Sequence, residues 1–277
     1  MELTDTHTHT WFSGHGTGTV EEVVQAACDK GITTIALTEH MPLPTVFDPD
    51  GNFGMTEDQV DQYLEEIELA RKRHPEIEVI CGVEADWRDG AEPYILKHLG
   101  PYEVVLGSVH VFTHDIGVEK GALWAFDHPG YVDGWEERGE ENVWREYFRL
   151  WRDAALSAVP FTIMTHPDLP KKLGFKPKFD PREMYAAMAE AAANKGRLIE
   201  VNTSGLHRPV RELYPAPALL AAFCGAGVGC TVSSDAHAPC EVGRDLEKAY
   251  AAMRVAGYKH VTVPTRNGDR RTIPLKI

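Results

Sequence analysis

The feature of this sequence that most restricts its fold is an alternation of apolar runs and amphipathic segments, repeated seven times along 277 residues. The apolar runs have the length and β-branched content of strands that are buried on both faces. They cover residues 3–9, 32–40, 78–87, 103–112, 161–169, 198–206 and 228–237. Segments with helical spacing lie between them, for example at residues 20–30, 57–74, 142–158, 181–195 and 216–226. Strands that alternate with helices pair in parallel, which predicts an α/β fold.

Seven strand-helix units predict a distorted TIM-like (β/α)7 barrel, and an open doubly wound sheet is the alternative that the pattern leaves open. No low-complexity linker separates the units, so we expect a single domain over residues 1–277. The last stretch, about 259–277, alternates weakly and contains Asn267-Gly268, a pair typical of tight hairpins. It predicts a small C-terminal ribbon.

Charge, hydropathy and cysteine usage exclude several classes of protein. No apolar stretch approaches the roughly 18 residues of a membrane helix, and the acidic start lacks a secretory pattern, so we expect no membrane contact and a cytoplasmic protein. A net charge of −14 disfavours a nucleic-acid partner but not a small phosphate ester. The five cysteines have no C-x-x-C spacing, which indicates neither a disulfide framework nor a thiolate zinc site.

Two long stretches interrupt the repeat, at residues 42–55 and 113–139. Each follows the carboxyl end of a predicted strand, which is the side of an α/β barrel where loops carry the active site. We therefore expect both to serve function rather than stability, and the second to close over a bound substrate.

Metal-binding side chains gather at the same strand ends. Six of the 13 histidines lie there: His7, His9, His40, His110, His166 and His237. The same ends carry Glu84 and Asp235, and the sixth ends with Glu200 and Asn202. Residues i and i+2 of a strand face the same way, so the H-x-H and D-x-H pairs each present two ligands to one cavity.

Any one of these histidines, taken alone, is more often a hydrogen-bonded core residue than a ligand. Together, six imidazoles and two carboxylates at one mouth would leave buried charge and unsatisfied nitrogens unless cations were present. Imidazole nitrogen with carboxylate oxygen suits Zn, Mn or Fe(II) better than Ca or Mg. His15, in the loop Ser13-Gly14-His15-Gly16, is a further candidate that spacing alone does not identify.

These residues form ordered motifs that resemble the polymerase and histidinol phosphatase (PHP) family over nearly the whole chain. The motifs are Asp5-x-His7-x-His9, Thr38-Glu39-His40, Gly82-x-Glu84-x-Asp86, Gly107-Ser108-x-His110, His166-Pro167-Asp168-Leu169 and Ser234-Asp235-x-His237. Residues 166–172 and 200–205 resemble the histidinol phosphatase branch rather than the polymerase-associated or exonuclease branches. Segment 113–139 matches no motif of the family residue by residue.

The resemblance implies two to three divalent ions, Zn, Mn or Fe, with a set of ligands for each of three sites. The first ion would take His7, His9, Glu84 and Asp235. The second would take Glu84, His110 and His166, and the third His15, His40 and His237. Glu84 would therefore bridge the first two.

Two neighbouring metals favour deprotonation of a shared water, so we expect a bridging hydroxide to attack phosphorus, with Glu84 and Asp235 as catalytic carboxylates. Basic groups near strand ends are the candidates for binding phosphate: Lys171, Lys172 and Arg208. His207, beside Arg208, is the candidate for protonating the departing alkoxide.

The predicted function is hydrolysis of L-histidinol phosphate to L-histidinol and phosphate, a step of histidine biosynthesis. The long loop offers candidates for the substrate's ammonium and its ring, namely Asp115, Glu119, Asp127, Trp124 and Phe126. One alternative is a PHP-type phosphoesterase for nucleotides or short oligonucleotides, which the lack of a basic, aromatic groove disfavours. Another is a non-enzymatic metal-binding barrel, which the complete ligand set disfavours.

Overall fold

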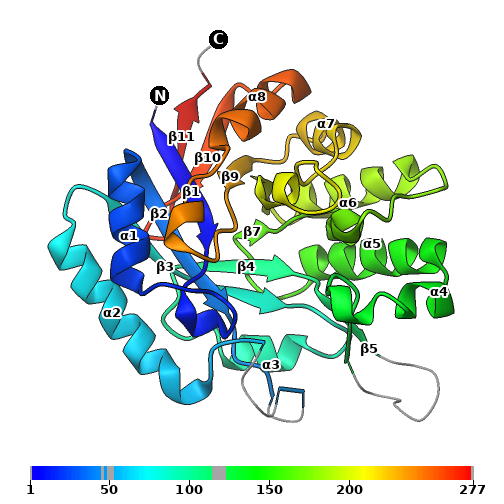
Figure 1. Ribbon diagram of the computed structural model, residues 1–277. Helices are drawn as coiled ribbons and strands as arrows, with labels where there is room; N and C mark the ends of the chain where they lie inside the picture. The colour runs from blue at the N-terminus through cyan, green and yellow to red at the C-terminus, as the bar shows by residue number, and fades with distance from the viewer. Residues whose placement is uncertain (1, 45–46, 49–52, 114–122, 276–277) are drawn as a thin grey trace.

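The computed structural model describes residues 2–44, 47–48, 53–113 and 123–275. Its core is a sheet of seven strands paired in parallel, in the order β1-β2-β3-β4-β7-β8-β9 (Figure 1). The strands are β1 (Leu3–Thr8), β2 (Ile32–His40), β3 (Glu78–Asp86), β4 (Val104–Ser108), β7 (Ile163–Met164), β8 (Leu198–Asn202) and β9 (Cys230–Ser233). Thr8 forms a parallel bridge to Ala236, and the His9 amide donates to the Ala236 carbonyl at 2.7 Å. These contacts bring the first and last strands together, so the predicted barrel is confirmed.

Helices connect consecutive strands and cover the outside of the barrel (Figure 1). They are α1 (Val20–Asp29), α2 (Val60–Arg73), α3 (Glu92–Lys97), α4 (Gly134–Arg138), α5 (Glu140–Leu156), α6 (Arg182–Asn194), α7 (Pro217–Gly225) and α8 (Leu246–Ala256). A capping box begins α1, since Thr19 and Glu22 satisfy each other's backbone amides. None of the described helices is both long and apolar enough to cross a membrane.

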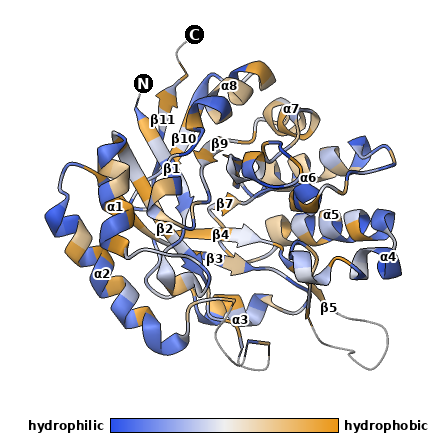
Figure 2. Ribbon diagram, in the orientation of Figure 1, coloured by the Kyte–Doolittle hydropathy of each residue, from blue (hydrophilic) through white to orange (hydrophobic). Residues whose placement is uncertain are grey.

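Apolar side chains form two separate layers around the strands. Helix α5 buries Trp144, Tyr147, Phe148 and Trp151 against the barrel, each contributing on the order of 2 kcal/mol or more. In Figure 2 the helices alternate hydrophobic and hydrophilic colour, as expected for elements with one buried face. A smaller cluster contains only strand residues, namely Ala36, Ile80, Val104, Leu106, Ile163 and Leu198.

The smaller cluster lies inside the barrel, below the mouth. On β3, Ile80 and Glu84 are four residues apart and face the same way, as do Ala36 and His40 on β2. Apolar residues therefore fill the lower interior, while the residues that follow on the same faces are polar. This division places the polar groups at the carboxyl ends of the strands.

Several strands end before their metal-binding residues, in contrast to the expected boundaries. The fifth expected strand, residues 161–169, is reduced to Ile163–Met164, and both His166 and Asp235 have positive φ angles, 20° and 52°. After β4 the chain leaves the sheet at His110, whose amide donates to Asp86 Oδ1 at 2.8 Å. These side chains thus reach the mouth from the turns that follow the strands rather than from the strands themselves.

Two small antiparallel ribbons complete the fold. In the long loop, β5 (Val111–Thr113) pairs with β6 (Leu123–Ala125), and residues 114–122 between them lie outside the described part. Near the C-terminus, β10 (His260–Pro264) pairs with β11 (Arg270–Pro274). The N-terminal strand and this second ribbon lie at the same end of the molecule in Figure 1.

Candidate metal centre

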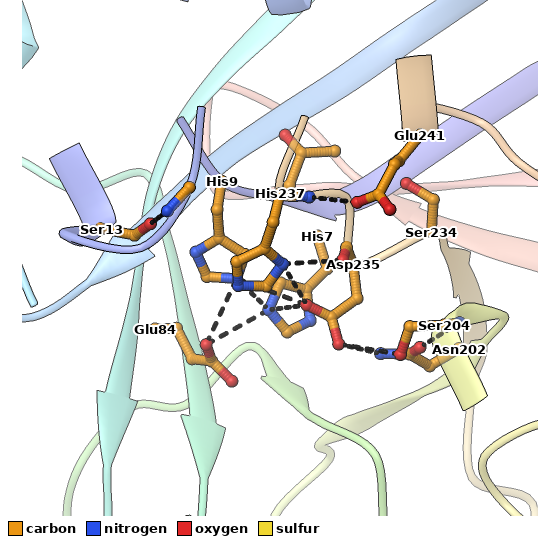
Figure 3. Close-up of polar contacts among 12 residues, drawn as sticks. His7, His9, Ser13, Glu84, Asn202, Ser204, Ser234, Asp235, His237 and Glu241 are labelled. Atoms are coloured by element: carbon orange, nitrogen blue, oxygen red, sulfur yellow. Dashed lines mark hydrogen bonds and ion pairs between the residues drawn. The ribbon is translucent and has the colours of Figure 1, made fainter. Parts of the chain in front are cut away.

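One histidine in β1 and one just after it meet two carboxylates at the barrel mouth. His7 and His9 are fully buried, and their Nε2 atoms lie 3.0 Å apart. Glu84 Oε2 lies 3.3 Å from His7 Nε2 and 3.5 Å from His9 Nε2. Asp235 Oδ1 lies 3.8 and 3.5 Å from the same two nitrogens. Four ligand atoms from three separate strand ends therefore surround one point, as Figure 3 shows.

The second oxygen of Glu84 faces a different pair of histidines. Glu84 Oε1 lies 3.1 Å from His166 Nε2 and 3.7 Å from His110 Nε2. Those two nitrogens are 3.3 Å from each other. The carboxylate thus stands between two imidazole clusters, with one oxygen turned to each, which is the arrangement that a bridging ligand requires.

A third group of imidazoles lies at the outer side of the mouth. His15 Nε2 and His237 Nε2 are 3.1 Å apart, and the His15 ring stacks on that of His40 with centroids 5.1 Å apart. His40 also approaches the bridge, since its Nδ1 lies 3.0 Å from Glu84 Oε2. The structure therefore brings together all nine residues that the sequence predicted as ligands.

The distances between the imidazole nitrogens are better explained by shared divalent ions than by direct contact between the imidazoles. Two imidazole nitrogens facing each other have either two lone pairs or two hydrogens in conflict unless one shared proton lies between them. Nitrogens bound to one metal at about 2.0–2.1 Å lie roughly 2.9–3.4 Å apart, whether octahedral or tetrahedral. The three Nε2 pairs measure 3.0, 3.3 and 3.1 Å. The described residues thus form clusters that can hold metal ions.

Electrostatics keeps the carboxylates of this centre ionised. Burial by itself raises the pKa of Glu84, but the neighbouring charges of His7 and His110 outweigh burial and hold that pKa well below its usual value. The pKa of Asp235 is lowered in the same way, with His7 as the strongest opposing charge. Burial, together with the nearby His237 and His40, lowers the pKa of His9, which favours the neutral imidazole that a metal needs.

A second layer of polar groups orients the ligands. Glu200, fully buried on β8, accepts hydrogen bonds from the His166 amide at 2.9 Å and Ser233 Oγ at 2.7 Å, and lies 3.1 Å from His7 Nδ1. Asn202 Nδ2 and Ser204 Oγ each donate to Asp235 Oδ2 at 3.1 Å (Figure 3). Glu200 and Asn202 were expected at the mouth as metal-competent groups, but they contact the ligands His7, His166 and Asp235. Glu200 and Asn202 nevertheless show the same i, i+2 spacing at a strand end that identified the ligands.

We expect Glu200→Gln to weaken metal binding about 10- to 100-fold, the range typical for groups that orient a ligand. The carboxylate accepts from His7 Nδ1–H and so turns the lone pair of His7 Nε2 toward the centre. The side-chain NH2 of glutamine would face hydrogen-bond donors such as the His166 amide and Ser233 Oγ, to which it cannot bond. Metal affinity measured by competition with a chromogenic chelator tests this, with Glu190→Gln on the exposed side of α6 as control. Equal affinity in both variants would contradict the role of Glu200.

The predicted lysines have different surroundings. Lys171 is buried, its Nζ 2.8 Å from Asp168 Oδ2 and 2.7 Å from the Leu213 carbonyl, so it is already neutralised within the protein. Lys172 Nζ lies 2.6 Å from Asp127 Oδ2. Burial raises the pKa of Asp127, but Lys172 and His110 outweigh it and hold that pKa at about 2. Asp127 therefore lies within electrostatic range of His110, whereas Lys171 contacts other partners.

The other residues that were predicted to bind substrate differ in how exposed their side chains are. Arg208 is exposed, and within the described part of the chain its guanidinium has no hydrogen bond or ion pair. His207 Nε2 lies 2.6 Å from Asp245 Oδ2. Trp124 is only 3% exposed, with its indole bonded to the Tyr131 carbonyl, so its ring belongs to the loop's core. Phe126 is likewise buried, and the candidates Asp115 and Glu119 lie outside the described residues.

Comparisons with known proteins agree on one family. The PHP domain matches residues 5–204. The probable histidinol-phosphatase of Deinococcus radiodurans is 38% identical over 94% of this chain and 96% of its own. The histidinol-phosphatase of Bacillus subtilis is 24% identical over 89% of this chain and 98% of its own. A solved histidinol phosphate phosphatase from Lactococcus lactis, complexed with zinc, L-histidinol and phosphate, has a TM-score of 0.76 at 21% identity, over 98% of this chain and 99% of that one.

Proposed function

The chain belongs to the PHP domain family, and on that premise we propose that it is a histidinol-phosphatase, hydrolysing L-histidinol phosphate to L-histidinol and phosphate. The relative from Deinococcus radiodurans supports this assignment, because it matches nearly end to end at 38% identity. The observation in the structure that carries it is Glu84, whose two oxygens face separate imidazole clusters in a barrel mouth.

The proposed cofactors are two to three divalent ions, Zn, Mn or Fe. Zinc is present in the related Lactococcus lactis structure. We assign His7, His9, Glu84 and Asp235 to one ion, Glu84, His110 and His166 to a second, and His15, His40 and His237 to a third. Ions of this kind, when bound, lower the pKa of water so that hydroxide is available as a nucleophile near neutral pH.

Cationic side chains at the mouth would hold the phosphate group. Arg208 is the strongest candidate, because its guanidinium is exposed and can present two parallel donors to phosphate oxygens. Lys172 is the second, with Asp127 holding its ammonium in place at 2.6 Å. His207 remains a candidate proton donor to the alkoxide, and its Nε2 lies 2.6 Å from Asp245 Oδ2. Lys171 is the weakest of the four, because Asp168 already neutralises it.

We expect histidinol phosphate to be hydrolysed with a kcat/KM roughly 100-fold or more above that of nucleotides and sugar phosphates. A site that pairs with both the phosphate and the ammonium of a substrate rejects compounds that leave those groups unpaired. Phosphate release measured across histidinol phosphate, nucleoside monophosphates, phosphotyrosine and short oligonucleotides tests this. The highest kcat/KM on a nucleotide or oligonucleotide would instead establish the alternative PHP-type phosphoesterase.

A further inference from the structure

A second group of metal-binding side chains lies away from the mouth, where the ends of α1 and α2 meet. Cys28 Sγ, in the last turn of α1, is 3.7 Å from Nδ1 of His74, the C-cap residue that follows α2. A carboxylate oxygen of Glu76 lies 3.6 Å from the same nitrogen. The three ligand atoms all lie within 4.8 Å of one another.

The two separations from His74 Nδ1, 3.7 Å to Cys28 Sγ and 3.6 Å to Glu76 Oε1, lie within a few tenths of an ångström of the edges of a tetrahedral zinc site. Bonds of about 2.3 Å to sulfur and about 2.0–2.1 Å to nitrogen and oxygen place neighbouring ligand atoms roughly 3.3–3.6 Å apart. A hydrogen bond between the His74 nitrogen and the Glu76 oxygen would be closer to ~2.9 Å. The observed 3.6 Å is too long for that bond, whereas it suits two atoms that share an ion.

The other nitrogen of His74 is held in the way that metal-binding histidines are held. His74 Nε2 lies 2.9 Å from Glu21 Oε1, and Arg73 lies 3.2 Å from the other oxygen of Glu21. Donation from Nε2–H to Glu21 leaves a lone pair on Nδ1, directed at Cys28 and Glu76. Cys28 Sγ, His74 Nδ1 and a Glu76 oxygen thus converge with their lone pairs. Among the described contacts, the proton of the Cys28 thiol is the one hydrogen available to lie between them.

The position of the group also favours a cation. Helices α1 and α2 run antiparallel to the strands they follow, so both end on the face of the barrel opposite the mouth (Figure 1). The carbonyl ends of both helices carry partial negative charge there. The Glu76 side chain is 61% exposed, so an ion and a water ligand can reach the group from solvent.

We propose that Cys28, His74 and Glu76 form a zinc site separate from the metal centre at the mouth, which joins the ends of α1 and α2. Burial and the nearby Glu76 raise the pKa of the Cys28 thiol to about 11, so the thiol is protonated without metal and releases its proton to solvent when zinc binds. One sulfur, one nitrogen and one oxygen suit zinc better than the harder Mg and Ca ions.

Cobalt(II) provides the test, because the ligands at the mouth are only nitrogen and oxygen. Addition of Co²⁺ to full-length protein in a non-chelating reductant should produce near-ultraviolet sulfur-to-cobalt charge-transfer absorption. With the mouth already loaded with metal, the band should saturate at one added equivalent per chain and disappear when Zn²⁺ is added. It should be absent in Cys28→Ser and retained in Cys240→Ser, which removes the exposed cysteine. No band, or a band that survives Cys28→Ser, overturns the proposal and leaves only direct polar contacts among Cys28, His74 and Glu76.

Glu21→Gln supplies a second arm that leaves all three ligands in place. The variant should bind Co²⁺ about 10- to 100-fold more weakly, because the carboxylate no longer fixes the His74 ring. Glu65→Gln, an exposed position on α2, is the matched control and should bind as the unmodified protein does. Equal affinity in the two variants overturns the site, because His74 Nδ1 would then not be the bound atom.

Discussion

Replacing Glu84 with glutamine is expected to lower kcat by about 10³-fold or more and to release at least one metal ion per chain. Two ions at the ~3.5–4 Å typical of paired metals repel each other, and a shared negative charge offsets that repulsion. In this protein one oxygen of Glu84 lies 3.3 Å from His7 Nε2 and the other 3.1 Å from His166 Nε2. Glutamine keeps the shape, but its NH2 cannot ligate. A 10³-fold fall in kcat corresponds to the loss of about 4 kcal/mol of transition-state stabilisation.

Arg208→Ala is the contrast that separates metal loss from substrate loss. The guanidinium has no partner among the described residues, so its removal should leave the metal centre intact. Losing a charged hydrogen bond of about 1.5–3 kcal/mol should lower kcat/KM roughly 10- to 100-fold at unchanged metal content. Elemental analysis and kinetics on both variants decide the matter. Full metal content with near-normal kcat in Glu84→Gln would show that Glu84 does not bridge.

Removal of the metals by dialysis against a strong chelator should abolish activity completely, and addition of Zn²⁺, Mn²⁺ or Fe²⁺ should restore it. The protein as isolated should contain two to three first-row ions at the mouth. Cys28→Ser is the variant in which to count them, since it removes the separate site proposed here. Thermal unfolding should occur at a lower Tm after chelation, because ions that bind only the folded protein stabilise it.

Two controls make the chelation experiment informative. Far-ultraviolet circular dichroism should be unchanged at 25 °C, because the apolar cluster of Ile80, Val104 and Leu106 below the mouth does not depend on metal. Addition of Ca²⁺ should not restore activity, since imidazole-rich sites bind it weakly. Activity that persists in chelator, with no first-row metal in the protein, would remove the basis of the proposed mechanism.

Much of the fold and the candidate metal centre could be predicted from the sequence because both depend on local patterns. Apolar runs of strand length separated by helical segments determine a parallel barrel, and position along a strand determines which end a residue occupies. His40 and Glu84, at the ends of β2 and β3, therefore had to lie at one mouth once the barrel closed. The spacings His7-x-His9 and Asp235-x-His237 then supplied pairs that enter the same cavity.

Only the tertiary structure decided how individual side chains are used. It turns the two oxygens of Glu84 to different clusters, and it pairs the buried Lys171 with Asp168. It also brings Cys28 within 3.7 Å of His74, 46 residues later, although no cysteine spacing suggested a metal site. The physical reason is the same in each case. Periodicity specifies which face of an element is buried, whereas the partner a side chain meets depends on how separate elements pack.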